Sequence, residues 1–219
     1  MKVDIQTNIK EVTKHLTLVQ KKQIPYAASF AMNKVMFGLQ KAEKKAVVRE
    51  FDNPTNFTKT GFVVVKSTKR NLTAELYINN AQGKDRASYM QYEIDGGTRH
   101  PKRKAIAIPR EKNFTGKTTQ AGNFRKGAID KFKKDKAKYF FGKPKGKVSA
   151  SEGIWERYGR DKTGTTSGAR IRQVALFTKY AKYKPLFPFY ELGNKVIMGR
   201  GGFKKHFEKA MRYALRTAR

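Results

Sequence analysis

A pair of carboxylates is the strongest candidate for catalysis in this sequence. Glu93 and Asp95 stand two residues apart in YEIDGG, and His100 and Lys102 follow shortly after them. Side chains two apart on a β-strand point to the same face, so these carboxylates could hold a metal ion for phosphodiester cleavage. The simpler interpretation is the edge of a strand that runs into a Gly-Gly turn. Since no second carboxylate cluster supports it, a metal-dependent nuclease is the least favoured function.

Other catalytic patterns are incomplete. The chain has no cysteine, which excludes disulfides, thiolate nucleophiles and cysteine-based zinc sites. GKTT at 116–119 resembles the end of a phosphate-binding loop, but Glu111 stands where that motif needs its first glycine. The three histidines, His15, His100 and His206, are far apart in sequence, whereas metal sites need clustered ligands. We therefore predict no catalytic residues, no metal site, no cofactor and no enzymatic activity.

The charge of the chain indicates an anionic partner. The 219 residues include 49 Lys and Arg against 17 Asp and Glu, a formal net charge of +32. Such an excess repels itself, so we expect the folded protein to meet a polyanion, nucleic acid first, or an acidic neighbour. No apolar run approaches the roughly 20 residues that cross a bilayer, and the N-terminus lacks a hydrophobic signal core. Neither a membrane partner nor secretion by that route is expected.

The positive charge is concentrated between residues 99 and 147. This segment holds 17 Lys and Arg but only 3 Asp and Glu, and we interpret it as a basic insertion. Contacts with a phosphate backbone need charge and no base recognition, so binding here should ignore sequence. The predicted nucleic-acid-binding residues are its densest basic positions: Lys102, Arg103, Lys104, Arg125, Lys126, Lys133, Lys134 and Lys136.

The chain places its single tryptophan, Trp155, in the polar stretch SEGIWERYGR. A strand here would alternate its side chains, with Ile154, Glu156 and Tyr158 on one face and Trp155 and Arg157 on the other. We favour a half-buried strand position for Trp155. The second interpretation is a surface for another subunit, formed by Trp155, Arg157 and Tyr158.

Helical periodicity marks both ends of the chain. Residues 7–23 have apolar side chains three and four apart, and Pro25 suits the first turn of a second helix that runs to about residue 49. This second helix carries a stripe of small residues: Ala27, Ala28, Ala31, Val35, Leu39, Ala42 and Ala46. A third helix over 201–219 has Phe and Ala on one face and Lys and Arg on the other.

The segments between these helices are mostly typical of strands. We predict strands at 2–6, 62–66, 72–78, 104–109, 153–158 and 170–180, strand-like structure at 184–189, and a helix passing into a strand over 128–141. Strands run together without βαβ alternation, so the fold class is α+β: a mixed or antiparallel β-sheet flanked by N-terminal helices and a C-terminal amphipathic helix. No long linker is visible, and we predict a single domain over 1–219 that carries the basic insertion.

The order of three short motifs resembles a known family. They are Asn53-Pro54-Thr55 with Phe57-Thr58, then Glu93-x-Asp95-Gly96-Gly97, then Gly153-Ile154-Trp155-Glu156-Arg157, followed by the terminal helix. This order is similar to bacteriophage minor tail proteins of the Z type, which are related to the tail-completion and neck proteins of tailed phages. The likeness covers most of the chain, from the alanine-rich helix to the C-terminus. It implies a mixed sheet flanked by two terminal helices, assembled as a ring at or near the head–tail joint.

Three functions follow from these observations. The favoured one is a structural virion protein without catalysis, a tail-completion, neck or minor tail component made in the host cytoplasm and located in the virion. Its expected partners are copies of itself in a homo-oligomeric ring, other phage neck and tail proteins, and genomic DNA through backbone contacts. The alternative is a sequence-independent nucleic-acid-binding protein in which Tyr139, Phe140 and Phe141 stack on bases. The metal-dependent nuclease is third.

Overall fold

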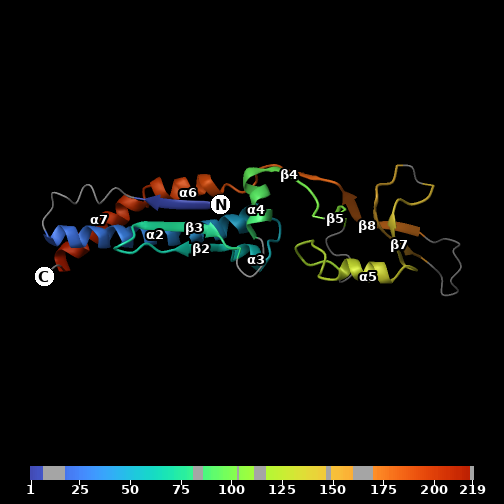
Figure 1. Cartoon of the computed structure of the whole chain (residues 1–219), viewed down its shortest axis with the longest axis horizontal. Coiled ribbons are helices and arrows are strands. Elements are labelled where there is room, and N and C mark those ends of the chain that lie inside the picture. The colour runs from blue at the N-terminus through green and yellow to red at the C-terminus, as the bar shows by residue number, and fades with distance from the viewer. Residues whose placement is uncertain are drawn as a thin grey trace. The chain divides into compact units, whose positions relative to one another are not determined.

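The computed structural model describes residues 1–6, 18–80, 86–102, 104–110, 117–146, 149–159 and 170–217. Its helices and antiparallel sheets form an α+β fold, which confirms the predicted class. In chain order the elements are β1 (Lys2–Gln6), α2 (Leu18–Glu50), α3 (Asn56–Lys59), β2 (Phe62–Val65), β3 (Thr73–Ile78), α4 (Arg86–Asp95), β4 (Gly97–Arg99), β5 (Ile106–Pro109), α5 (Ala128–Lys134), β6 (Tyr139–Gly142), β7 (Gly153–Tyr158), β8 (Arg170–Thr178), β9 (Ala181–Tyr183), α6 (Phe189–Met198) and α7 (Phe203–Thr217) (Figure 1).

The chain divides into two compact units. Unit 1 combines Met1–Gly96 with Lys184–Arg219, and unit 2 is Gly97–Tyr183. The sequence prediction was one domain with a basic insertion at 99–147. Unit 2 begins close to that insertion but continues to Tyr183, so the basic segment folds together with the strand that carries Trp155.

Helix α2 is the central element of unit 1. It contacts β2, β3, α6 and α7, and its predicted stripe of small residues is buried from Ala27 to Ala46, except at the half-buried Ala42. Small side chains allow this close approach of several elements to one helix, so the predicted packing face is confirmed. The lysines of the opposite face are exposed at Lys34, Lys41 and Lys45 and half-buried at Lys44.

The predicted start of this helix at Pro25 is wrong. Helix α2 is already formed at Leu18 and passes through Pro25 without a break. A proline removes one backbone hydrogen bond, and the burial of the following turns outweighs that local cost. Residues 7–17, where the predicted first helix begins, lie outside the described residues.

A three-stranded antiparallel sheet in the order β1-β3-β2 completes the core of unit 1 with the help of α6. The hairpin β2–β3 confirms the strands predicted at 62–66 and 72–78.

The segment before α6 packs on this sheet. Phe62 of β2 lies 6.1 Å from Phe187 and 6.3 Å from Phe189, measured between ring centroids. The strand-like structure predicted at 184–189 is wrong, because the segment is irregular from Lys184 to Pro188 and α6 begins at Phe189. Gly193 of α6 approaches the side chain of Val3, so α6 also packs on β1.

The segment that contains Glu93 and Asp95 is helix α4 and not a strand. Met90 and Ile94 are its buried residues, four positions apart, and both belong to the core of unit 1. This spacing is one turn of an α-helix, and it outweighs the strand-like appearance of the aromatic side chains around it.

Unit 2 contains a four-stranded antiparallel sheet in the order β5-β8-β7-β6 and a two-stranded sheet of β4 and β9. The predicted strands at 104–109, 153–158 and 170–180, and the change from helix to strand over 128–141, are confirmed. Among the described residues, the buried core of this unit consists of Ala128, Phe132, Tyr139, Ile154, Val174 and Ala175.

Among the described residues each unit buries one carboxylate, and the two carboxylates have opposite surroundings. Glu156 in unit 2 is held by ion pairs to Lys138 and Arg172. Glu43 in unit 1 is fully buried, and neither of its carboxylate oxygens has a hydrogen-bond partner among the described residues. Burial raises the pKa of Glu43 from 4.5 to about 8, so it is mostly protonated at neutral pH.

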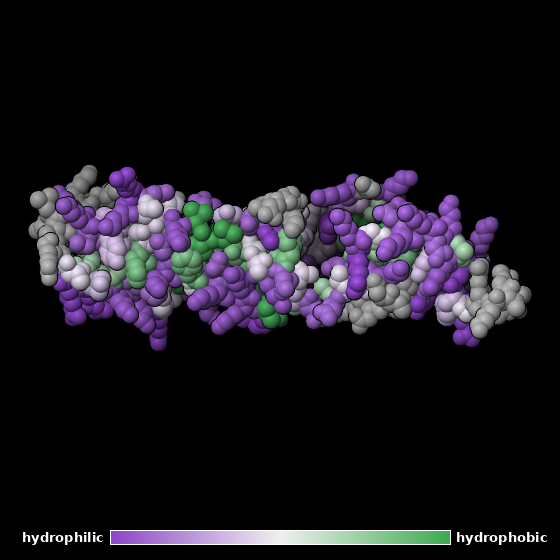
Figure 2. Space-filling view, turned by 90° about the horizontal axis from the view of Figure 1, so that it is seen from below, coloured by the Kyte–Doolittle hydropathy of each residue, from purple (hydrophilic) through white to green (hydrophobic). Residues whose placement is uncertain are grey.

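Hydrophilic side chains cover most of the face drawn in Figure 2. Across the described part of the chain, no helix combines the length and the apolar character that a membrane crossing requires.

Candidate nucleic-acid interface

Helix α5 places two of the predicted basic residues, Lys133 and Lys134, on the surface of unit 2. Gly127 precedes it with a φ of 76°, a left-handed conformation that glycine adopts without strain. Ala128 and Phe132 face the core, while Lys131, Lys133 and Lys134 lie in the last turn. Cations are stabilised at the C-terminal end of a helix by its dipole, so the sequence of α5 favours this exposed basic end.

A pocket of about 510 Å³ lies where α5 meets β6. It is lined by Phe132, Lys133, Lys136, Tyr139, Phe140 and Phe141. Two predicted nucleic-acid-binding lysines thus stand beside three aromatic residues of one strand. The pocket combines what a nucleic-acid strand needs from a protein that does not read its sequence: positive charge and aromatic surface.

The three aromatic residues of β6 have different roles. Tyr139 is buried, and its ring lies 4.7 Å from that of Phe132, so it belongs to the core and cannot stack on a base. Phe140 is half-buried, and Phe141 is 39% exposed with its ring 6.2 Å from Phe177. Of the three predicted stacking residues, Phe141 therefore offers the most accessible ring.

Trp155 of β7 is paired with Phe140 of the neighbouring strand and packs beside it. Its ring is nearly parallel to that of Phe140, at 13° and 6.4 Å, and the Arg157 guanidinium lies 4.6 Å from the centre of the Phe140 ring. Nη1 of Arg157 donates to the carbonyls of Lys136 and Ala137, at 3.1 and 3.3 Å. Arg157 thereby fixes the α5–β6 connection on β7.

The predicted alternation along β7 is confirmed. Ile154 and Glu156 are buried, whereas Trp155 and Arg157 are half-buried on the other face. Tyr158 is exposed and lies on the same face of β7 as Glu156. The Arg172 guanidinium lies 5.6 Å from the centre of the Tyr158 ring. Of the three predicted interface residues, only Trp155 and Arg157 therefore share a face. The indole N–H of Trp155 is buried and has no hydrogen-bond partner within the described segments.

Glu156 organises the face of β7 opposite to Trp155. Its side chain is 3% exposed, and its oxygens accept from Nε of Arg172 at 2.5 Å and from Nζ of Lys138 at 3.2 Å. The Tyr139 hydroxyl completes the set at 3.4 Å. The hydrogen bond to Glu156 raises the pKa of Lys138, and burial, followed by the charge of Glu156, raises the pKa of Tyr139. This carboxylate is therefore neutralised within the unit and does not offset the charge of the pocket.

The structure brings together only part of the predicted basic set. Lys133 and Lys136 line the pocket, and Lys134 is exposed on the same helix. Lys102, Lys104, Arg125 and Lys126 are not among the residues that line it, and Arg103 lies outside the described residues. Nε of Arg125 donates to the carbonyl of Thr118 at 3.1 Å, which gives this residue a structural role in its loop.

The geometry does not support the metal site proposed at Glu93 and Asp95. Two residues apart on helix α4 they are turned by about 200°, so they do not share a face as they would on a strand. They belong to unit 1, whereas His100 and Lys102 belong to unit 2. Burial raises the pKa of Glu93, and its backbone carbonyl accepts from the N–H groups of Leu186 and Phe187. Among the described residues, no three His, Cys, Asp or Glu side chains are grouped as a metal site requires.

Sequence analysis missed two cations of this surface, Lys138 and Arg172. Arg170 and Arg172 alternate in RIRQV, and this period of two was the signal that a strand presents both to one face. That Arg172 meets Glu156 depends on the register of β7 against β8, in which these two residues are paired.

No protein-family model, curated protein or solved structure matches the chain.

Proposed function

We propose that this chain is a structural protein of a tailed bacteriophage without enzymatic activity. It is a tail-completion, neck or minor tail component, and it assembles as a homo-oligomeric ring near the head–tail joint. The surface formed by α5, β6 and β7 of unit 2 faces the DNA path and contacts the phosphate backbone. The α+β fold with a long N-terminal helix and a C-terminal amphipathic helix agrees with what the family resemblance implies.

One observation carries the DNA-facing part of this proposal. Residues 97–183 hold 24 Lys and Arg against 6 Asp and Glu, and Glu156, one of these carboxylates, is buried against its own cations. Among the described residues that line the pocket of Lys133 and Lys136 there is no carboxylate. A surface of this kind attracts phosphates and has no side-chain set that reads bases.

The salt dependence of DNA binding tests this part. Affinity for a random-sequence duplex should fall with a log–log salt slope of about −0.9 per phosphate neutralised. The triple variant Lys133→Gln, Lys134→Gln, Lys136→Gln should reduce the slope by up to about three. The matched control replaces three exposed lysines of α2, Lys21, Lys41 and Lys45, and should keep the slope of the wild type.

Light scattering on the purified protein and electron microscopy test the assembly. Rings, or monomers that form rings when concentrated, support the neck or tail role. A protein that stays monomeric and shows no salt-dependent DNA binding even at low ionic strength contradicts both parts of the proposal.

A second function is supported by the exposed ring of Phe141 beside two lysines. In this alternative the chain binds single-stranded nucleic acid, and a base stacks on that ring. Stacking contributes about 1–3 kcal/mol per base, so Phe141→Ser should weaken oligo-dT binding at least fivefold and leave duplex binding unchanged. Equal losses for both nucleic acids would favour the backbone contacts proposed above.

A further inference from the structure

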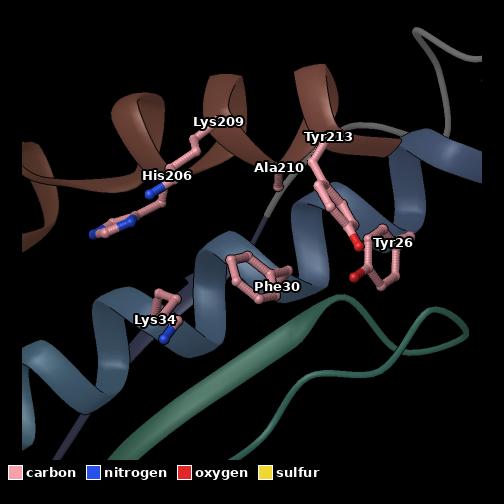
Figure 3. Close-up of a pocket in the computed structure, with 7 residues that line it drawn as sticks. All are labelled: Tyr26, Phe30, Lys34, His206, Lys209, Ala210 and Tyr213. Carbon is pink, nitrogen blue, oxygen red and sulfur yellow. The ribbon is translucent and has the colours of Figure 1, made fainter. Parts of the chain in front are cut away.

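Unit 1 contains a groove of about 550 Å³ between α2 and α7, and none of its described lining residues was predicted from the sequence as a binding residue. Figure 3 shows its seven lining residues: Tyr26, Phe30 and Lys34 from α2, and His206, Lys209, Ala210 and Tyr213 from α7. The α2 positions are four residues apart, and on α7 Lys209 and Ala210 lie three or four residues from both His206 and Tyr213, so each helix presents one continuous face to the groove.

The walls of the groove are aromatic and unusually accessible. Phe30 is 39% exposed and Tyr213 is 62% exposed, while Ala210 is buried. Phe37 lies two turns beyond Phe30 on α2 and is 38% exposed, so the accessible rings continue along the helix. Grouped exposed apolar side chains of this kind mark interaction surfaces rather than ordinary solvated ones.

Lysine ammonium groups cover these rings. Nζ of Lys34 lies 5.6 Å from the centre of the Phe30 ring, Nζ of Lys69 lies 5.2 Å from Tyr26, and Nζ of Lys66 lies 5.7 Å from Phe37. No carboxylate is among the described residues that line the groove. Helix α7 adds Lys204, Lys205, Lys209, Arg212 and Arg216 against the single acidic residue Glu208.

We propose that the α2–α7 groove docks an acidic segment of another protein, with an apolar side chain inserted between Phe30 and Tyr213. Carboxylates of this segment pair with Lys34 and Lys209 at the rim, while the apolar side chain is buried against the rings and Ala210. This mode corresponds to an amphipathic helix seated in a groove. The proposal concerns unit 1 and does not rest on the DNA-facing role of unit 2.

Two other occupants fit the same residues less well. A second copy of this chain would have to supply the acidic segment from a sequence with 49 Lys and Arg against 17 Asp and Glu, so few of its segments complement this basic groove. A nucleobase needs a free aromatic face, and an ammonium group lies over each of the Tyr26, Phe30 and Phe37 rings. A carboxylate that approaches the same rings forms ion pairs with these ammonium groups.

The probe is a fluorescein-labelled synthetic helical peptide with leucine at every third and fourth position and glutamate elsewhere. A comparison peptide has serine in place of each leucine, and binding is measured by fluorescence anisotropy with the full chain. We expect the leucine peptide to bind at least tenfold more tightly than the serine peptide. Equal binding of the two would show attraction by charge alone and would overturn the proposal.

Variants locate the peptide in the groove. Phe30→Ser and Tyr213→Ser should each weaken binding of the leucine peptide at least tenfold, and Lys34→Gln with Lys209→Gln should lower both affinity and salt dependence. The apolar control is Val48→Ser, an exposed position of α2 that does not line the groove. The charge control is Lys41→Gln with Lys45→Gln, and circular dichroism melting verifies that every variant is folded.

Three results would overturn the assignment of the occupant. Groove variants that bind the peptide like the wild type would place the contact elsewhere. Displacement of the peptide by oligo-dT, with loss of oligo-dT binding in Phe30→Ser, would assign the groove to nucleic acid. A self-associated wild type that Phe30→Ser converts to a monomer would assign it to a second copy of this chain.

Discussion

The buried carboxyl of Glu43 makes the stability of unit 1 depend on pH. Its oxygens lack hydrogen-bond partners within the described residues, and burial raises its pKa from 4.5 to about 8. Desolvation is the cause of this shift, because removal from water disfavours the charged form. We expect Glu43→Gln, which keeps the shape of the side chain and removes the charge, to stabilise the protein at alkaline pH.

The direction of this pH dependence follows from the number of protons that the folded and unfolded states bind. Between pH 4.5 and about 8 the unfolded chain has released the proton of Glu43 and the folded chain retains it. The folded state therefore binds more protons, and the free energy of unfolding falls as the pH rises, by up to about 1.4 kcal/mol per pH unit. Over the whole window the loss is at most about 5 kcal/mol, complete above about pH 8 and absent below about pH 4.5.

Urea unfolding of the wild type and of Glu43→Gln at about pH 5 and about pH 9 measures this term. Far-UV circular dichroism is the suitable signal because it reports on α2, whereas Trp155 lies in unit 2. The two proteins should differ little at the lower pH, and the variant should be more stable by a few kcal/mol at the higher one. The difference between them isolates Glu43 from other titrating groups of unit 1, such as Glu93, whose pKa burial also raises.

Glu208→Gln serves as the control for this experiment, since it removes an exposed carboxylate of α7. It should change stability by less than about 0.5 kcal/mol at either pH. If the advantage of Glu43→Gln does not grow with pH, the carboxyl is not desolvated and the reasoning is wrong. The same holds if the variant is less stable than the wild type at both pH values.

The remaining predictions concern packing and assembly. Ala31→Leu should overfill the fully buried face of α2 and lower the free energy of unfolding by about 1–3 kcal/mol. Ala42 is half-buried, so Ala42→Leu should cost less. Thermal unfolding measures both, and melting of both variants at the wild-type temperature would contradict this packing. Gly153→Ala should prevent normal pairing of β7 with β8, because a Cβ there would lie 2.0 Å from the carbonyl oxygen of Ala175. A native-like fluorescence spectrum in that variant would show that the strands adapt. Trp155 fluorescence should shift to the blue on assembly, and a Trp155→Phe variant that assembles normally would place it outside the subunit interface.

The sequence alone determined the elements that depend on short-range periodicity. Alternation of apolar and polar residues predicted the β2–β3 hairpin and placed β7 at 153–158, because side chains on a strand repeat every two residues. The 3.6-residue period of Phe and Ala predicted α7 in the same way. The charge of the basic segment and the absence of cysteine were likewise visible without any structure.

Some errors arose where local signals were ambiguous. Pro25 suggested the start of a helix, yet α2 passes through it, because packing of the whole helix outweighs one lost hydrogen bond. Met90 with Ile94, and Phe189 with Gly193, are spaced by one helical turn, but aromatic and proline residues nearby favoured strands. In both segments the helical period was present, but the strand propensity of the neighbouring residues was given more weight.

Only the tertiary structure decided which distant residues meet. The groove of Phe30 and Tyr213 joins two helices from opposite ends of the chain, and the pairing of Glu156 with Arg172 depends on strand register. The burial of Glu43 follows from the number of elements that pack around α2, which helical spacing alone does not reveal. Contacts of this kind depend on long-range packing, and a period read along the sequence contains no information about which partner will cover a given face.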